Sequence, residues 1–278
     1  MTTDPVIRPL TLPETEMLVD WARAEGWNPG FADAAAFHAA DPNGLIGCFV
    51  EDKMAAGISA VRYGEDFGFI GLYIARSDFR GKGYGHRVWN AGMAHLQGRT
   101  IGLDGVAERQ TNYRQMGFEA VYETFRWSGR VEGGLSEDVV SITAGLEPVV
   151  CDYDRHFFPS ERSAFLTEWL QPPRFAKAIL GGSGLRGYAV CRQCHDGYKI
   201  GPLFGETAED AISLLRACAI ETGAQTMHID LPASQTSFAA ELASHGFTRG
   251  FTTTRMYSGP VREIRMAGIF GITTLELG

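Results

Sequence analysis

The second half of this chain repeats the first, and this repeat limits its possible folds more than any other feature of the sequence. Residues 117–129 begin with Gly-Phe and end with Ser-Gly, and residues 246–259 do the same. Thr100-Ile-Gly-Leu-Asp104 corresponds to Thr226-Met-His-Ile-Asp230, and Phe69-Ile-Gly71 corresponds to Lys199-Ile-Gly201. The shift stays close to 129 residues in all three matches. Because chance matches would not keep a constant shift, the pattern predicts two copies of one fold.

The length and composition agree with two domains of ordinary size. The 278 residues are 45% hydrophobic, which is enough to form a core in each half. Residues 129–145 are rich in glycine and acidic side chains, as is typical of a connecting segment. We therefore expect a first domain at 1–132, a linker at 133–147 and a second domain at 148–278.

An anion-binding turn is predicted in the first half, between a strand and a helix. Apolar residues alternate at 70, 72 and 74, the period of a strand, and recur at helical spacing from Val88 to Leu96. The turn combines glycines at every second position with cationic side chains: Arg80, Gly81, Lys82, Gly83, Gly85 and His86. Glycines leave the backbone N–H groups unscreened, and the helix N-terminus adds positive potential. The turn therefore predicts a pyrophosphate site.

Two common phosphate motifs do not fit this turn, and a third one does. A Walker loop needs Ser or Thr after Gly-Lys, but Gly83 follows Lys82. A dinucleotide fingerprint needs a third glycine where the chain has His86. The remaining pattern is Arg-x-x-Gly-x-Gly, at Arg80, Gly83 and Gly85, which resembles the coenzyme A signature of the GNAT acyltransferase superfamily. A glycine-rich surface turn without a ligand is the alternative.

The resemblance to GNAT proteins extends over nearly the whole chain. Downstream of the turn, Tyr113-x-x-x-Gly117-Phe118 is similar to a second GNAT motif. The second half resembles the degenerate GNAT-like domain found C-terminally in some bacterial members. Residues 205–210 hold two glutamates and an aspartate where the first half has glycines and cations, and such carboxylates would repel a pyrophosphate. The resemblance implies a tandem GNAT fold of the α/β class, with a mixed sheet and one acyl-CoA site.

The resemblance also implies which residues bind the donor, acetyl-CoA. In GNAT enzymes the strand before the turn hydrogen-bonds the pantetheine arm through its backbone, and the turn wraps the pyrophosphate. By resemblance the strand residues are Leu72, Tyr73 and Ile74, and the turn residues are Arg80, Gly81, Lys82, Gly83, Tyr84, Gly85 and His86. The next strand of these folds splays away and opens a slot for the acetyl group. Leu103 and Asp104 are therefore expected to line this slot.

Tyr113 is the candidate general acid. By resemblance to GNAT enzymes, which often carry a tyrosine that acts as general acid at this position, Tyr113 would protonate the departing thiolate. A phenol with a pKa of about 10 can supply that proton. A packed helix aromatic is the alternative. The asparagine often found seven residues before this tyrosine is Val106 here, which departs from the family pattern.

The general base is left open between three groups. The strand position that holds a glutamate in some GNAT enzymes falls near Phe67 or Gly68, and neither can act as a base. Asp104 ends a strand at the slot and can serve as base or as ammonium anchor. The terminal carboxylate of Gly278 is the second candidate, provided that residues 272–277 run back into the pocket as a strand. Deprotonation through water is the third.

The acceptor site is expected near Trp27 and Asn28. They lie in the turn between the first two helices, a segment that covers the acceptor in GNAT folds. An indole face beside an amide suits a substrate with apolar and polar parts. A helix-terminating turn is the alternative. In the second half, His228 and Asp230 either face the shared cleft or have structural roles.

Charge and cysteine content argue against several other classes of function. The formal net charge of −8 disfavours nucleic acid or an anionic membrane as a partner. No apolar run approaches about 20 residues, and Met1-Thr-Thr-Asp-Pro lacks signal-peptide character, so we expect a cytoplasmic protein. Residues 191–195 match a c-type haem attachment motif, which requires export, and no second close pair of ligands completes a zinc site. We therefore expect neither metal nor haem.

Together these features predict a GNAT N-acetyltransferase that transfers the acetyl group of acetyl-CoA directly to the amine of a small-molecule acceptor. A non-catalytic acyl-CoA-binding regulator or sensor is the alternative, because the strand glutamate is absent and Val106 departs from the pattern. The identity of the acceptor, the use of longer acyl donors and the oligomeric state are left open.

Overall fold

The computed structural model describes residues 4–134, 136–182 and 184–278. Residues 1–3 of the predicted first domain, 135 of the predicted linker and 183 of the predicted second domain lie outside the described residues. The strands of the first half are β1 (Val6–Pro9), β2 (Leu45–Val50), β3 (Lys53–Tyr63), β4 (Phe67–Ala75), β5 (Thr100–Val106) and β6 (Glu119–Gly129). Those of the second half are β7 (Val139–Ser141), β8 (Phe175–Gly181), β9 (Gly184–Gln193), β10 (Tyr198–Gly205), β11 (Met227–Pro232), β12 (Thr248–Ser258) and β13 (Ile269–Gly271). The helices are α1 (Leu12–Ala24), α2 (Asp33–Ala40), α3 (Tyr84–His95), α4 (Gln110–Gln115), α5 (Glu147–Asp154), α6 (Ser163–Trp169), α7 (Ala208–Thr222) and α8 (Thr236–Ser244).

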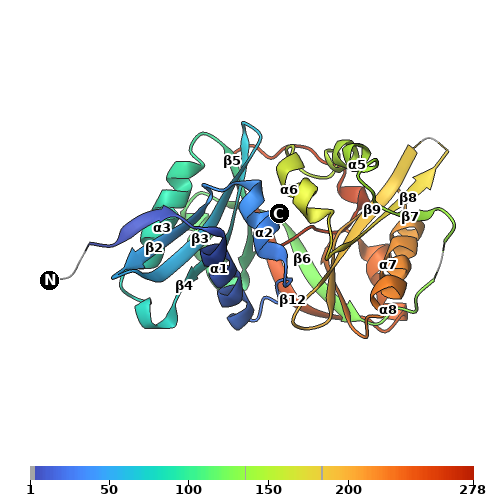
Figure 1. Cartoon of the computed structure of the whole chain (residues 1–278), viewed down its shortest axis with the longest axis horizontal. Helices are drawn as coiled ribbons and strands as arrows, with labels where there is room; N and C mark the ends of the chain where they lie inside the picture. The colour runs from blue at the N-terminus through green and yellow to red at the C-terminus, as the bar shows by residue number, and fades with distance from the viewer. Residues whose placement is uncertain (1–3, 135, 183) are drawn as a thin grey trace.

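The two halves share one continuous sheet (Figure 1). Its strand order is β1-β2-β3-β4-β5-β12-β6-β11-β10-β9-β8-β7, and β13 pairs with β10. Strand β12, from the second half, lies antiparallel between β5 and β6 of the first half. Strand β6, from the first half, lies antiparallel between β12 and β11 of the second half. Each half therefore receives one strand from the other.

Two buried ion pairs of the same design hold the exchanged strands. Arg126 on β6 is the direct cross-strand partner of Asp230 on β11 and donates to both carboxylate oxygens, at 2.8 and 2.9 Å. Arg255 on β12 is the cross-strand partner of Asp104 on β5, with both hydrogen bonds at 2.9 Å. Two-pronged arginine–carboxylate pairs fix geometry as well as charge. Both pairs join one half to the other.

Helices pack on the sheet in equivalent places in the two halves. Helix α3 packs on β2, β3 and β4, and α7 packs on β8, β9 and β10. Helix α2 of the first half packs on α6 of the second, as Figure 1 shows. The predicted linker, residues 133–147, contains β7, which pairs with β8 and so extends the sheet of the second half.

Strands β4 and β5 part in the middle of the first half. They run parallel and pair only as far as Ile70 and Leu103, although both strands continue beyond that point. Against β3, β4 holds one extra residue in the stretch that faces Gly57 and Ser59. Leu72 lies in this stretch with a φ of 45°, in the left-handed region. A bulge of this kind bends its strand, so β4 leaves β5 and a gap opens between them.

The equivalent gap in the second half is filled by the chain itself. Strands β10 and β11 pair in parallel only as far as Ile200 and Ile229. Beyond that point β13 pairs with β10, and Ile272 N–H donates to the Asp230 carbonyl of β11 at 2.9 Å. The C-terminal segment therefore occupies in the second half the space that is open in the first.

Candidate active site

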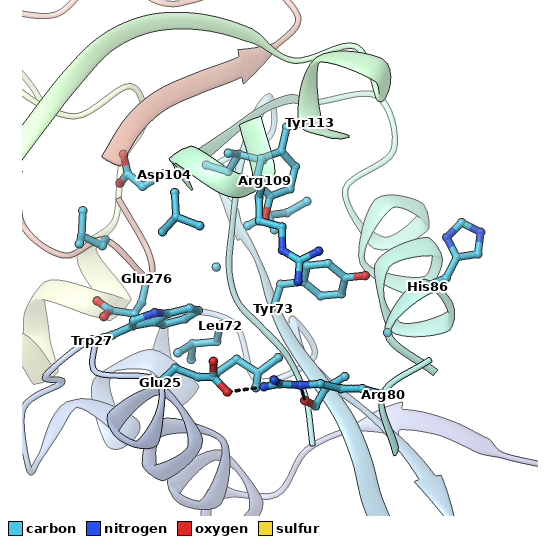
Figure 2. A pocket seen from close by; sticks show the side chains of 18 of the residues that line it. Glu25, Trp27, Leu72, Tyr73, Arg80, His86, Asp104, Arg109, Tyr113 and Glu276 are labelled. Carbon is cyan, nitrogen blue, oxygen red and sulfur yellow. Dashed lines mark hydrogen bonds and ion pairs between the residues drawn. The ribbon is translucent and has the colours of Figure 1, made fainter. Parts of the chain in front are cut away.

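A cavity of about 480 Å³ occupies the gap between β4 and β5 (Figure 2). It extends from the glycine turn before α3, along the bulged end of β4, to the loop after α1. The predicted site residues that line it are Trp27, Leu72, Tyr73, Ile74, Arg80, Gly81, Gly83, Tyr84, Gly85, His86, Leu103, Asp104 and Tyr113. Lys82 and Asn28 are not among its lining residues.

The glycine turn opens the N-terminus of α3 toward the cavity. Gly83 is the N-cap of α3 with a φ of 83°, and Gly81 has a φ of 76°. A Cβ atom at either position would meet nothing in the chain within 4 Å, so the side that a larger residue would cover is open space. The first N–H groups of a helix have no partner within the helix. This end of the cavity therefore suits an anion.

The three cations of the turn differ in where their side chains lie. Arg80 donates from Nε to the Ala75 carbonyl at 2.9 Å and forms an ion pair with Glu25, the C-cap residue of α1, which also lines the cavity. Lys82 turns away and donates to the Asp78 carbonyl at 2.9 Å. His86 lines the cavity on the first turn of α3. Of these three basic residues, Arg80 and His86 line the cavity and Lys82 does not.

Two tyrosines line the middle of the cavity, on the side where Figure 2 shows Arg109. The ring of Tyr113 stacks on Trp89, with centroids 5.7 Å apart, and Tyr73 packs against the same indole at 5.3 Å. Burial raises the pKa of Tyr113 to about 12, and it also raises the pKa of Tyr73. Both phenols therefore keep their protons at neutral pH, which is the form that a general acid needs.

Asp104 lines the slot as predicted, but it is already paired. Its side chain is fully buried, and both carboxylate oxygens accept hydrogen bonds from Arg255. Burial raises the pKa of Asp104, and the positive charge of Arg255 opposes that rise. A carboxylate held in this way is poorly placed to take a proton from a substrate, because that would leave the buried guanidinium without its counter-ion.

Trp27 lines the cavity, whereas Asn28 does not. Helix α1 ends at Ala24, Gly26 follows with a φ of 83°, and Trp27 N–H donates back to the Ala22 carbonyl, as at many helix C-termini. This places the indole of Trp27 in the cavity wall. Asn28 instead exchanges two hydrogen bonds with the backbone of Asp196, at 2.9 and 3.0 Å. Asn28 therefore ties the loop to the second half rather than facing the cavity.

The C-terminal tail reaches the cavity, but not in the predicted way. Strand β13 ends at Gly271, so the strand expected at 272–277 is not formed. Gly278 does not line the cavity, and its carbonyl oxygen accepts a hydrogen bond from the buried Arg162 at 3.4 Å. Leu275 and Glu276 line the cavity instead.

Several cavity residues were not predicted from the sequence: Glu25, Arg109, Phe251, Thr253, Leu275 and Glu276. Phe251 and Thr253 lie on β12, and Leu275 and Glu276 lie on the tail, so all four come from the second half. No local motif marks them. The repeat could have pointed to β12, because it aligns this strand with β6, but the exchange of the two strands has no signal in the sequence.

Other candidates from the sequence have structural roles. Asp230 is held by Arg126, and His228 shares a hydrogen bond of 2.7 Å with Ser128 Oγ. Cys191 and Cys194 are buried. Across the described ranges, no three His, Cys, Asp or Glu side chains are grouped so that they could hold a metal ion. None of the helices in these ranges is long and apolar enough to cross a membrane.

Comparisons with known proteins agree with this architecture. A model described as the acetyltransferase (GNAT) family matches residues 10–118, and one described as an acetyltransferase (GNAT) domain matches residues 150–271. A holothin acyltransferase from Pseudoalteromonas sp. (strain SANK 73390) is 32% identical over 276 residues, which cover 98% of this chain and 94% of that protein.

Solved structures share the fold over the whole length. A protein from Pyrococcus horikoshii, provisionally assigned as an acetyltransferase, superposes with a TM-score of 0.81 at 19% identity, covering 100% of this chain and 97% of that one. A tandem GNAT protein from the clavulanic acid biosynthesis pathway gives a TM-score of 0.63 at 12% identity, with 92% and 99% covered. At these identities the likeness concerns the fold alone.

A cavity beside a bulged strand, in a chain with two halves that both match GNAT models, is that of a tandem acyltransferase. The chain belongs to the GNAT acyltransferase family, whose members use acyl-CoA. The predicted family, the tandem α/β fold and the enzyme class are thereby confirmed. Acetyl as the acyl group and a small-molecule amine as the acceptor remain predictions.

Proposed function

We propose that this enzyme transfers the acetyl group of acetyl-CoA to the amine of a small-molecule acceptor. The observation that carries the proposal is one cavity that joins the open N-terminus of α3 to the gap between β4 and β5. The diphosphate of the donor would bind the glycine turn, and the pantetheine arm would follow β4. The thioester would then lie at the gap, beside Leu72 and Leu103.

The donor end has the chemistry that a diphosphate requires. The start of α3, which includes His86, and Arg80 line the same space. Arg80 would exchange its ion pair with Glu25 for the phosphate oxygens, which offer stronger two-pronged contacts. Farther along, β4 beyond Ile70 has lost its pairing with β5, so its backbone groups on that side are available to the pantetheine amides.

The acceptor end favours a small substrate. Its walls come from both halves: Trp27 from the first, and Phe251, Thr253 and Glu276 from the second. A site enclosed by two interlocked halves leaves little room for a protein chain. The name of the Pseudoalteromonas relative gives holothin as the acceptor of that enzyme, which supports a dedicated acceptor molecule here.

Tyr113 would supply the proton that the leaving group needs. As the amine nitrogen attacks the thioester carbonyl, the C–S bond breaks and the sulfur gains negative charge. A phenol that is protonated at neutral pH and lines the same cavity can donate to this sulfur. The products are an amide and free coenzyme A.

The experiment is a measurement of thiol release from acetyl-CoA with the full chain. The acceptors are holothin, polyamines, amino acids, arylalkylamines and aminoglycosides, and reactions without acceptor measure background hydrolysis. We expect at least one amine to raise thiol release well above the background. Calorimetry with acetyl-CoA measures donor binding separately. Donor binding without release to any acceptor would contradict the proposal and favour an acyl-CoA-binding regulator.

A further inference from the structure

One carboxylate in the cavity has no partner. Glu276 is 1% exposed, and neither of its carboxylate oxygens has a hydrogen-bond partner among the described residues. In the view of Figure 2, Glu276 lies on the same side of the cavity as Trp27 and on the opposite side from His86. Burying a carboxylate without partners is costly, and most buried polar atoms in proteins are hydrogen-bonded. A group kept in this state therefore calls for a partner that arrives with the substrate.

The backbone around Glu276 is held firmly. Its carbonyl oxygen accepts a hydrogen bond from Ser59 Oγ at 3.2 Å, and the carbonyl of Leu277 accepts one from Tyr63 at 3.1 Å. A Cβ atom at position 71 would lie 2.0 Å from the Glu276 carbonyl oxygen, so the tail approaches β4 as closely as a glycine allows. The side chain is thus positioned by backbone contacts at the start of the bulge and not by its own carboxylate.

The other carboxylates on the cavity wall are engaged. Asp104 is bound by Arg255 through both oxygens, and Glu25 is paired with Arg80. Among the described acidic side chains that line the cavity, Glu276 is the one without an ion pair or hydrogen bond. It is therefore the carboxylate that can accept a proton without breaking an existing interaction.

Charged groups from four elements surround Glu276. Burial raises its pKa, and Asp33 of α2 adds to the rise, whereas Lys199 of β10, Arg192 of β9 and Arg126 of β6 oppose it. None of these groups comes within ion-pair distance of the Glu276 carboxylate. The cations favour the negative form of Glu276, whereas burial raises its pKa above the usual value of a glutamate, which makes its carboxylate a stronger base.

We propose that Glu276 is the general base of the transfer reaction, so that the C-terminal tail of the second half completes the active site of the first. The inference rests on the proposed function. The N–C bond forms as the C–S bond breaks. The proton lost by the amine nitrogen goes to a Glu276 carboxylate oxygen, and the thiolate takes a proton from Tyr113. Solvent then returns both side chains to their starting states, which leaves one amide and one thiol.

The test compares Glu276→Gln with the wild-type chain in acetyl transfer to the best acceptor. The amide keeps the shape of the side chain but cannot take the proton, so kcat should fall about 10²-fold or more. Wild-type kcat should fall as the pH drops through the raised pKa of Glu276, because the base becomes protonated. This acid limb should be absent from the pH profile of kcat in Glu276→Gln. Glu276→Asp, with a shorter carboxylate, should restore the limb at reduced kcat.

Two measurements separate this role from a structural one. The thermal unfolding midpoint and the calorimetric Kd for acetyl-CoA should match the wild type in Glu276→Gln. Glu263→Gln makes the same change at an exposed glutamate in the same C-terminal segment and should leave kcat unchanged. If Glu276→Gln does not fold, Glu276→Asp carries the test, and wild-type kcat in that variant would overturn the proposal.

Other outcomes would also overturn it. An unchanged kcat and acid limb in Glu276→Gln would exclude a base role. A higher KM for the acceptor with kcat and acid limb unchanged would make Glu276 an anchor for the substrate. Both results require a wild-type enzyme that turns over, so they are distinct from failure of the proposed function, in which no acceptor supports thiol release.

Discussion

Five acidic side chains of the cavity wall fall into two kinds. Asp104 and Glu25 are held by arginines, whereas Glu276 and the two phenols, Tyr73 and Tyr113, remain free to exchange protons. Burial raises the pKa of both Asp104 and Glu276, because it disfavours the charged form of an acid. What distinguishes them is the presence of a fixed counter-ion, and this decides which side chains can change protonation during a reaction.

Tyr113→Phe should lower kcat about 10²-fold while leaving the Kd for acetyl-CoA unchanged, because only the donated proton is lost. The measurement is thiol release at saturating acceptor, with calorimetry for the donor. Tyr198→Phe, on β10 outside the cavity, is the matched control and should keep wild-type kcat. Wild-type kcat in Tyr113→Phe would show that another group protonates the thiolate.

Asp104→Asn should lower stability rather than remove a base. It leaves the buried Arg255 without its counter-ion, which costs about 3–5 kcal/mol in comparable buried pairs. Urea unfolding measures this loss, and the surviving activity should keep the acid limb in its pH profile. If the variant lost the acid limb at wild-type stability, Asp104 and not Glu276 would be the base.

At the scale of elements, the start of α3 depends on glycines for two separate reasons. Gly83 adopts a φ of 83°, which an L-residue with a side chain rarely adopts, and it also borders the cavity. Gly98, between α3 and β5, has a φ of 82° and equally open surroundings, but it does not line the cavity. The two positions therefore separate backbone strain from ligand contact.

Gly83→Ala and Gly98→Ala should each destabilise the protein by about 1 kcal/mol, because both force alanine into the left-handed region. Only Gly83→Ala should weaken acetyl-CoA binding, by about tenfold or 1.4 kcal/mol, since its methyl group enters the space of the diphosphate. Thermal unfolding and calorimetry measure the two effects. Equal donor affinity in both variants would place the diphosphate elsewhere.

The tail and β4 fit together through Gly71. Gly71→Ala would place a methyl group 2.0 Å from the Glu276 carbonyl oxygen, so the tail must move. We expect a loss of about 1–3 kcal/mol in stability, as for other overpacked sites, together with a large loss of kcat. Gly145→Ala, whose Cβ would lie 3.9 Å from the nearest atom, should change stability by less than about 0.5 kcal/mol. Full activity in Gly71→Ala would mean that the tail position is not critical.

At the scale of the molecule, the exchange of β6 and β12 makes the two halves one folding unit. Without β12, strands β5 and β6 would each lose a neighbour, and the Asp104 carboxylate would lose Arg255. The tail adds a second link, since it fills the gap between β10 and β11 and then reaches β4. The second half therefore supports the active site in two ways, through an exchanged strand and through Glu276.

A fragment of residues 1–132 should consequently not fold alone, because its sheet would be open where β12 belongs. The full chain should unfold in urea in one transition, with coincident tryptophan fluorescence and circular dichroism. Co-expression of 1–132 with 133–278 should restore acetyl-CoA binding. A cooperative transition and donor binding in the isolated fragment would show that the halves are independent.

Local patterns were sufficient to predict most of the residues that line the cavity near the start of α3. The strand period at 70–74, the glycines of the turn and the helix that follows are neighbours in the chain, and their chemistry depends on backbone geometry that short sequences encode. Lys82 shows the limit of this reasoning. The sequence predicted that Lys82 binds the donor with the rest of the turn, but its Nζ donates to the Asp78 carbonyl and the residue does not line the cavity, which only the conformation of the turn decides.

The acceptor side could not be predicted in this way. Three contacts fix the residues on that side: Asn28 with Asp196, Asp104 with Arg255, and Gly71 with the Glu276 backbone. Each contact joins residues more than 140 positions apart in the sequence. By itself, the sequence determined that the chain is a duplicated GNAT protein, and it predicted one glycine-rich turn for a phosphate, because repeats and turn chemistry are local. Only the tertiary structure decided which cavity carboxylate has no ion pair or hydrogen bond among the described residues. That depends on which strand of each half pairs with the other half and on where the tail lies in the fold.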